Sequence, residues 1–181
     1  MTMVLLEFMD RRGLSLVCNL REASRMRFLG MSTTTTSIVS VLCSLIETCK
    51  DGQEGFREAA ENVTDLDYKS LFTGLANQRQ LYTGELRRML LAMGESVEDS
   101  GSVAGAVHRG WMDLKGALTS GSEHAILAEC ERGEDSAVAR YREALEHDDL
   151  PGNIRRVIDQ QYAWVQAAHD RIRDLRDRTR G

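Results

Sequence analysis

Four polar residues occupy positions at which the repeating pattern of apolar residues predicts a side chain that faces the core. A packed helix normally carries aliphatic residues at such positions. The four residues are Cys49, Gln78, Cys130 and Gln161. A buried amide is costly unless it finds a hydrogen-bond partner. We therefore predict that these residues form a hydrogen-bonded polar layer that fixes the register of the helices, with a ligand site as the alternative.

The same level of a helical bundle is where a carboxylate-bridged di-iron centre would lie. Such a centre takes a Glu from each of two helices and a Glu-x-x-His motif from each of the other two, and its oxygen and imidazole ligands suit iron or manganese. The corresponding motifs here are Gln78-x-x-Leu81 and Gln161-x-x-Trp164, which contain neither a carboxylate nor an imidazole. We therefore predict no cofactor and no standard di-iron site.

One layer away, a second set of residues offers a fallback metal site. Glu47 and Glu85 should lie at similar height, and His169 ends the broken motif Gln166-x-x-His169. Glu85-x-x-Arg88 is also broken, because a guanidinium has no free lone pair with which to coordinate a metal ion. This set leaves iron or manganese binding open as an alternative, while solvated surface positions are the simpler interpretation.

The two seam cysteines, Cys49 and Cys130, suggest another alternative, a thiol-based redox sensor. A reactive thiol must be exposed and have a lowered pKa, whereas a buried Cys packs as a small apolar residue. With Cys18 and Cys43 the chain has four cysteines, which do not form the dense framework of a small secreted protein. Reduced thiols and a cytoplasmic location are therefore expected.

The segment His108-Arg109-Gly110-Trp111 carries the other candidate site. Trp111 is expected to pack a connecting helix onto the bundle, with His108 and Arg109 bonding helix ends or acidic residues. An interaction surface is the alternative.

The elements that would position these residues are helices. Apolar and small residues recur at alternating steps of four and three, which is the seam of a packed bundle helix. The expected helical repeats cover residues 38–63, 71–92, 126–144 and 154–175, with a shorter helix at about 102–118.

An internal repeat indicates how the helices are connected. Cys49–Glu54 is similar to Cys130–Asp135, and the repeat at 71–82 aligns with that at 154–165. Two helical hairpins thus share one pattern, and the shorter helix between them suits a long crossover connection. The sequence predicts an all-α, ferritin-like four-helix bundle with a helical crossover between two pseudo-symmetric hairpins.

Composition limits the partners. The chain has 181 residues and a net charge of −5. This negative charge would repel the phosphate backbone of a nucleic acid, so a nucleic-acid partner is not expected. No apolar run approaches the roughly 18–20 residues of a membrane span.

Residues 1–30 are basic and aperiodic, so we expect a poorly ordered extension or a mis-set start, with the bundle at 31–178. A protein partner or a homo-oligomer is the expected mode of interaction.

The chain resembles a proteobacterial family of ferritin-like four-helix-bundle proteins of unknown function. The residues that carry this resemblance are Leu45-Ile-Glu-Thr-Cys-Lys-Asp-Gly52, Gly101-Ser-Val-Ala-Gly-Ala-Val-His-Arg-Gly-Trp-Met-Asp-Leu-Lys115 and Ala128-Glu-Cys-Glu-Arg-Gly-Glu-Asp135. The resemblance implies the fold but no activity. We expect a non-enzymatic interaction protein, associated with stress responses by family analogy alone, and keep an atypical metal-binding protein or oxidoreductase as the rival hypothesis.

Overall fold

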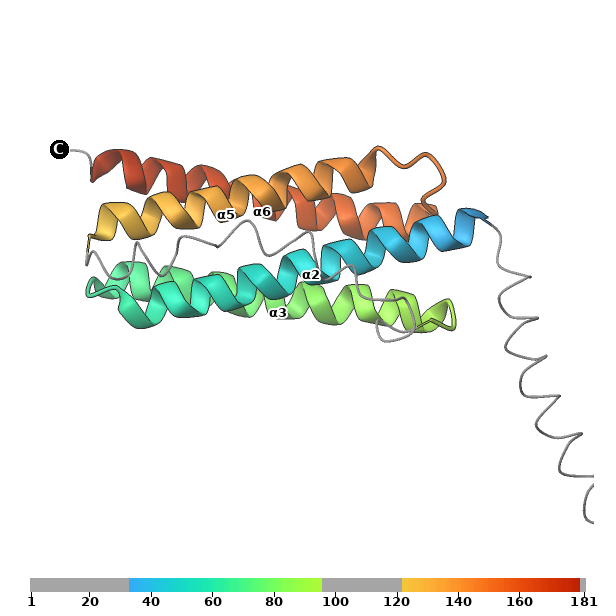
Figure 1. Cartoon of the computed structure of the whole chain (residues 1–181), viewed down its shortest axis with the longest axis horizontal. Coiled ribbons are helices and arrows are strands. Elements are labelled where there is room, and N and C mark those ends of the chain that lie inside the picture. Colours follow the sequence, from blue (N-terminus) through green and yellow to red (C-terminus); the bar gives the residue numbers. More distant parts are fainter. Residues whose placement is uncertain (1–32, 96–121, 180–181) are drawn as a thin grey trace, which may run out of the picture. The chain divides into compact units, whose positions relative to one another are not determined.

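The computed structural model describes residues 33–95 and 122–179, which contain four helices and no strand. Figure 1 shows these helices, which are α2 (Thr33–Asn62), α3 (Leu66–Ala92), α5 (Glu123–Leu145) and α6 (Gly152–Arg178). The predicted all-α four-helix bundle is confirmed. Residues Ile38–Gly181 form one compact unit, separate from the chain up to Ser37.

Several sequence predictions fall outside the described residues. They concern the extension at 1–30 and the crossover helix at 102–118, which carries His108, Arg109 and Trp111.

Local capping chemistry sets the ends of the helices. The Asp65 carboxylate accepts hydrogen bonds from the backbone N–H groups of Asp67 (2.8 Å) and Tyr68 (3.1 Å), which satisfies free donors at the start of α3. The Ser122 hydroxyl accepts from the N–H of Ala125 and caps α5 in the same way. Gly94 has φ +79° just after α3, a conformation that glycine adopts without a Cβ clash.

The second and third described helices, α3 and α5, run parallel to one another. Thr64, just before α3, donates a hydrogen bond from Oγ1 to Oε1 of Glu123, the first residue of α5, at 3.2 Å. Both helices therefore begin at the same end of the bundle, as Figure 1 also shows. Because α3 ends at the opposite end, the chain between Glu95 and Ser122 connects the two ends of the bundle.

The interior contains two apolar clusters at different heights. The first core cluster includes Leu42, Leu86, Tyr141 and Ile158, and its members end at Cys49 on α2 and begin at Tyr82 on α3. The second core cluster lies nearer the α2–α3 turn and includes Phe56, Phe72, Ile126 and Ile172. Residues of every helix lie between these two clusters, and this intervening level is where the polar side chains gather.

Candidate functional site

A buried ion pair occupies the level between the two core clusters. Arg79 of α3 donates a hydrogen bond from Nη2 to Oε2 of Glu134 on α5 at 2.6 Å, and each side chain is only 1% exposed. The other terminal nitrogen of Arg79, Nη1, donates to Oε1 of the neighbouring Gln78 at 2.8 Å. The pair joins the first helical hairpin to the second across the middle of the bundle.

The surroundings of Arg79 are shaped to hold a guanidinium. Its Cζ atom lies 5.8 Å from the ring centroids of Phe56 and of Tyr82, so the cation faces two aromatic rings. Gly52 of α2 lies against the same side chain, since a Cβ added at that position would be 3.5 Å from the Arg79 Cδ. An alanine Cβ at position 52 would meet Arg79 at an ordinary contact distance, so only a bulkier side chain would compete with Arg79 for this space.

Burial and charge act in opposite directions on Arg79. Removal from water disfavours its cation, but the adjacent Glu134 carboxylate outweighs that effect and raises the pKa of Arg79 above its usual range. The Glu134 Oε1 atom is buried and has no hydrogen-bond partner among the described residues. Among the described residues, Arg79 is the partner that balances the negative charge of Glu134, and either partner would be costly to bury without the other.

A hydrogen-bonded chain extends from this level toward the surface. Gln161 Nε2 donates to Glu85 Oε2 at 2.8 Å, which leaves Gln161 Oε1 to accept from the Tyr141 hydroxyl, also at 2.8 Å. Because the single phenol proton is used in that bond, the Cys49 thiol donates to the Tyr141 oxygen, 3.1 Å away. The four side chains come from α2, α5, α6 and α3 in turn and tie all four helices together.

Burial makes the thiols of this region poor nucleophiles. Cys49 is fully buried, and burial raises the pKa of its thiol to about 11. Burial likewise raises the pKa of Cys130 well above its usual value. Thiolate, the reactive form, is therefore scarce at both positions at neutral pH.

The structure separates the four residues predicted to form a polar layer. Cys49 and Gln161 lie in the hydrogen-bonded chain, and Gln78 is half-buried beside Arg79. Cys130 belongs to the second core cluster, where apolar side chains surround it. The sequence analysis did not single out Arg79, Glu134 or Tyr141 as site residues, and all three are buried.

The fallback metal residues are not brought together. Glu47 forms an ion pair with Lys50 at 2.6 Å, Glu85 binds Gln161, and His169 binds two aspartates. Across residues 33–95 and 122–179, no group of three or more His, Cys, Asp or Glu side chains is placed to hold a metal ion.

The residues at mid-height do not fit a di-metal centre. Two divalent cations a few ångströms apart need several carboxylates to balance their charge. This level instead presents a guanidinium paired with the buried Glu134 carboxylate, the Glu131 carboxylate paired with Arg176, a thiol, a phenol and an amide. A metal ion here would lie against the Arg79 cation.

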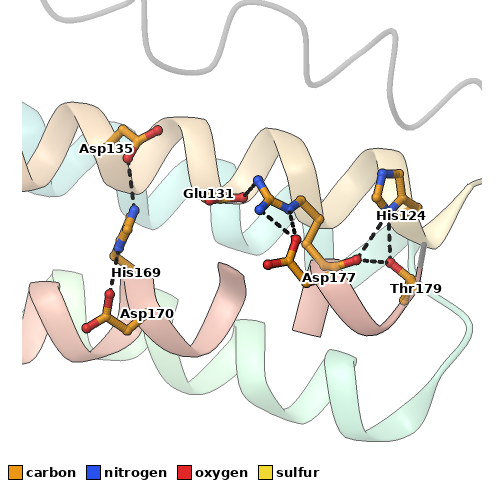
Figure 2. Close-up of polar contacts among 8 residues, drawn as sticks. His124, Glu131, Asp135, His169, Asp170, Asp177 and Thr179 are labelled. Carbon is orange, nitrogen blue, oxygen red and sulfur yellow. Dashed lines mark hydrogen bonds and ion pairs between the residues drawn. The ribbon is translucent and has the colours of Figure 1, made fainter. Parts of the chain in front are cut away.

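A second polar region, the α5–α6 seam, is drawn in Figure 2. His169 Nε2 lies 2.9 Å from Asp135 Oδ1, and His169 Nδ1 lies 3.1 Å from Asp170 Oδ1. Further along, Arg176 forms ion pairs with Glu131 and Asp177, and His124 contacts Thr179 at 2.8 Å. These contacts fasten the second half of α6 to the first half of α5.

The α5–α6 seam also shifts the titration of one carboxylate. The hydrogen bond from His169 is the largest effect that lowers the pKa of Asp170 below its usual value, and Arg173 adds to it.

Comparison with known families places the chain. The sequence profile of a family described as "Domain of unknown function (DUF2383)" matches residues 37–147. The chain belongs to this family. The DUF2383 match contains α3, α5 and both members of the buried ion pair, whereas α6, with Gln161 and His169, follows it. A comparison with curated proteins finds no match.

Within the part of the chain that the structure describes, no helix has the length and apolar character needed to cross a bilayer.

Proposed function

We propose that this chain is a ferritin-like bundle that acts without a di-iron centre, as a non-enzymatic protein that works through contacts with another protein chain. The parallel course of α3 and α5 supports the ferritin-like assignment. It requires one long connection along the bundle, which is the connectivity that distinguishes ferritin-like folds from bundles with short loops only.

The Arg79–Glu134 pair is the observation that carries this proposal. In a di-iron bundle, inward carboxylates and imidazoles leave room and negative charge for two cations. Here a fixed cation takes the central position and neutralises the buried Glu134 carboxylate beside it. The pair thus performs the charge balance that a metal would otherwise perform, and it offers no open coordination position.

Exposed apolar side chains support the role in protein contacts. Leu81 of α3 is 69% exposed and Trp164 of α6 is 56% exposed. Large aromatic residues are enriched in protein interfaces relative to the rest of the surface. The net charge of −5 disfavours nucleic acid as the partner, so we propose a protein partner or a second copy of the chain, in the bacterial cytoplasm and in a stress-associated role.

Two alternatives receive less support. An atypical metal-binding protein or oxidoreductase would have to assemble its ligands from Glu47, Glu85 and His169, whose side chains are engaged in separate contacts. A thiol sensor would need exposed thiols with a lowered pKa, whereas Cys49 and Cys130 are buried and have raised pKa values.

Elemental analysis of the full chain, purified from cells grown with excess iron and manganese, tests the proposal. We expect no stoichiometric iron or manganese. As a matched comparison, the Glu47→Ala/Glu85→Ala double variant should have the same metal content as the wild type. About two equivalents of metal per chain, lost in the double variant, would overturn the proposal and identify an unorthodox metal enzyme.

A further inference from the structure

A groove lies between the C-terminal turns of α3 and the N-terminal turns of α6. Its cavity volume is about 540 Å³, which is within the range of small-molecule sites. Six apolar residues line most of it, namely Met89, Ala92, Met93, Pro151, Ile154 and Val157. The two methionines have flexible, polarizable side chains that adapt to ligands of different shape.

The carboxylate of Glu85 marks the inner end of this groove. Gln161 Nε2 donates to Glu85 Oε2 at 2.8 Å, and Gln161 is itself only 1% exposed and held by Tyr141. Glu85 is therefore a half-buried anion in a fixed position. Its second oxygen, Oε1, makes no hydrogen bond to any described residue and can accept one from a bound molecule.

The one cationic residue of the groove, Arg88, directs its charge elsewhere. Arg88 is an exposed residue of α3, and its Nη1 atom lies 3.9 Å from the position that a Cβ would take at Gly84, one turn back along the helix. The aliphatic part of Arg88 can line the groove while its guanidinium stays in water. Among the lining residues, the charge that remains inside the groove is therefore negative.

We propose that this groove binds a small amphipathic organic cation, with its ammonium group on Glu85 and its aliphatic part against Met89, Ile154 and Val157. The fixed carboxylate explains the preference for a cation, and the apolar walls explain the need for an aliphatic tail. The start of α6 borders the same groove without a side-chain cap and would favour an anion. The charge of the ligand is therefore the decisive quantity.

Titration of the full chain with octylammonium, octanoate, 1-octanol and methylammonium tests this proposal, with backbone amide chemical shifts as the readout. We expect octylammonium alone to bind tightly enough to saturate shifts in the last turns of α3 and the first turns of α6. Glu85→Gln should weaken its binding about tenfold or more, because a charged hydrogen bond is lost. The new amide oxygen still accepts from Gln161, which preserves the fold.

Two further variants separate the groove from general charge effects. Asp159→Asn removes one exposed carboxylate from the outer face of α6 and should leave binding unchanged. Val157→Trp should fill the groove and abolish binding without touching Glu85. The proposal is overturned if octanoate binds as well as octylammonium, if Glu85→Gln binds as the wild type does, or if no probe binds.

Discussion

At the scale of single residues, the buried Arg79 is the unusual feature. Arg is seldom fully buried unless it is paired, and here its charge is paired with Glu134. Removing one member of such a pair leaves an isolated charge in the interior, whereas replacing both with apolar residues of similar size is often neutral. Single and paired substitutions should therefore differ sharply in their effect on the free energy of unfolding.

We expect Arg79→Met to lower the free energy of unfolding by about 3–5 kcal/mol, because Glu134 is left buried and unpaired. The Arg79→Met/Glu134→Leu double variant should recover most of this loss. Urea denaturation followed by circular dichroism measures both values.

Arg57→Met is the matched control, since Arg57 pairs with Glu54 at 4.0 Å on the exposed surface. It should change the free energy of unfolding by less than about 1 kcal/mol. Equal losses in the single and double variants would contradict this account.

The residue scale also shows what the sequence could predict about the site. The spacing of apolar residues at alternating intervals of four and three correctly placed Cys49 and Gln161 inside the bundle. An α-helix repeats every 3.6 residues rather than 3.5, so the inward face drifts by about 20° per heptad. This drift brings Arg79 inside and turns its neighbour Gln78 partly outward. Charged residues next to an apolar seam are normally assigned to the surface. The burial of this ion pair could not be predicted, because it depends on contacts between helices that are far apart in the sequence.

At the scale of helices, the α5–α6 seam joins two neighbours through paired charges on their outer edge. The predicted repeats at 38–63, 126–144 and 154–175 match α2, α5 and α6 closely. α2 begins earlier than its apolar repeat, at Thr33, because a helix continues through polar residues that have no apolar period. The partners of His169 could not be predicted, since they depend on the rotation of α6 against α5.

The seam also makes stability depend on pH. Because the pKa of Asp170 is lowered in the folded state, its contribution is present above the unfolded value of about 3.9 and is lost as the pH falls through the folded pKa. Asp170→Asn should therefore lower the melting temperature at pH 7 but not at the acidic end of the titration. Calorimetry across this range measures the effect, which is less than about 1 kcal/mol for a partly exposed pair.

A neighbouring carboxylate supplies the control for this titration. Asp174→Asn removes an exposed carboxylate of α6 and should change the melting temperature little. His169→Gln should reproduce most of the Asp170→Asn effect, since it removes the hydrogen bond that lowers the pKa. An effect of Asp170→Asn that persists unchanged in the His169→Gln background would show that the histidine is not the cause.

At the scale of the whole bundle, the face formed by α3 and α6 presents the apolar surface. The Glu85–Gln161 contact fixes the relative height of these antiparallel helices. One turn further toward the α2–α3 turn lie Leu81 on α3 and Trp164 on α6, so the two exposed side chains lie at similar height. A second copy of the chain is always available to cover such a surface.

We expect the purified chain to self-associate through this face. The Leu81→Ser/Trp164→Ser double variant should shift the equilibrium toward monomer at micromolar concentration, as measured by sedimentation velocity. Leu66→Ser removes an even more exposed leucine, 78% exposed, at the far end of α3 and should leave association unchanged. If the wild type is strictly monomeric at all concentrations, the face has no role in self-association.

The position of the buried ion pair has a consequence for the order of folding. Each hairpin has a short turn and mostly local contacts, which form quickly. Arg79 and Glu134 belong to different hairpins, so their charges leave water only when the hairpins dock, after the long connection has closed. Interactions made after the rate-limiting barrier slow unfolding without speeding folding. If docking follows that barrier, the pair governs how long a folded molecule lasts rather than how fast it forms.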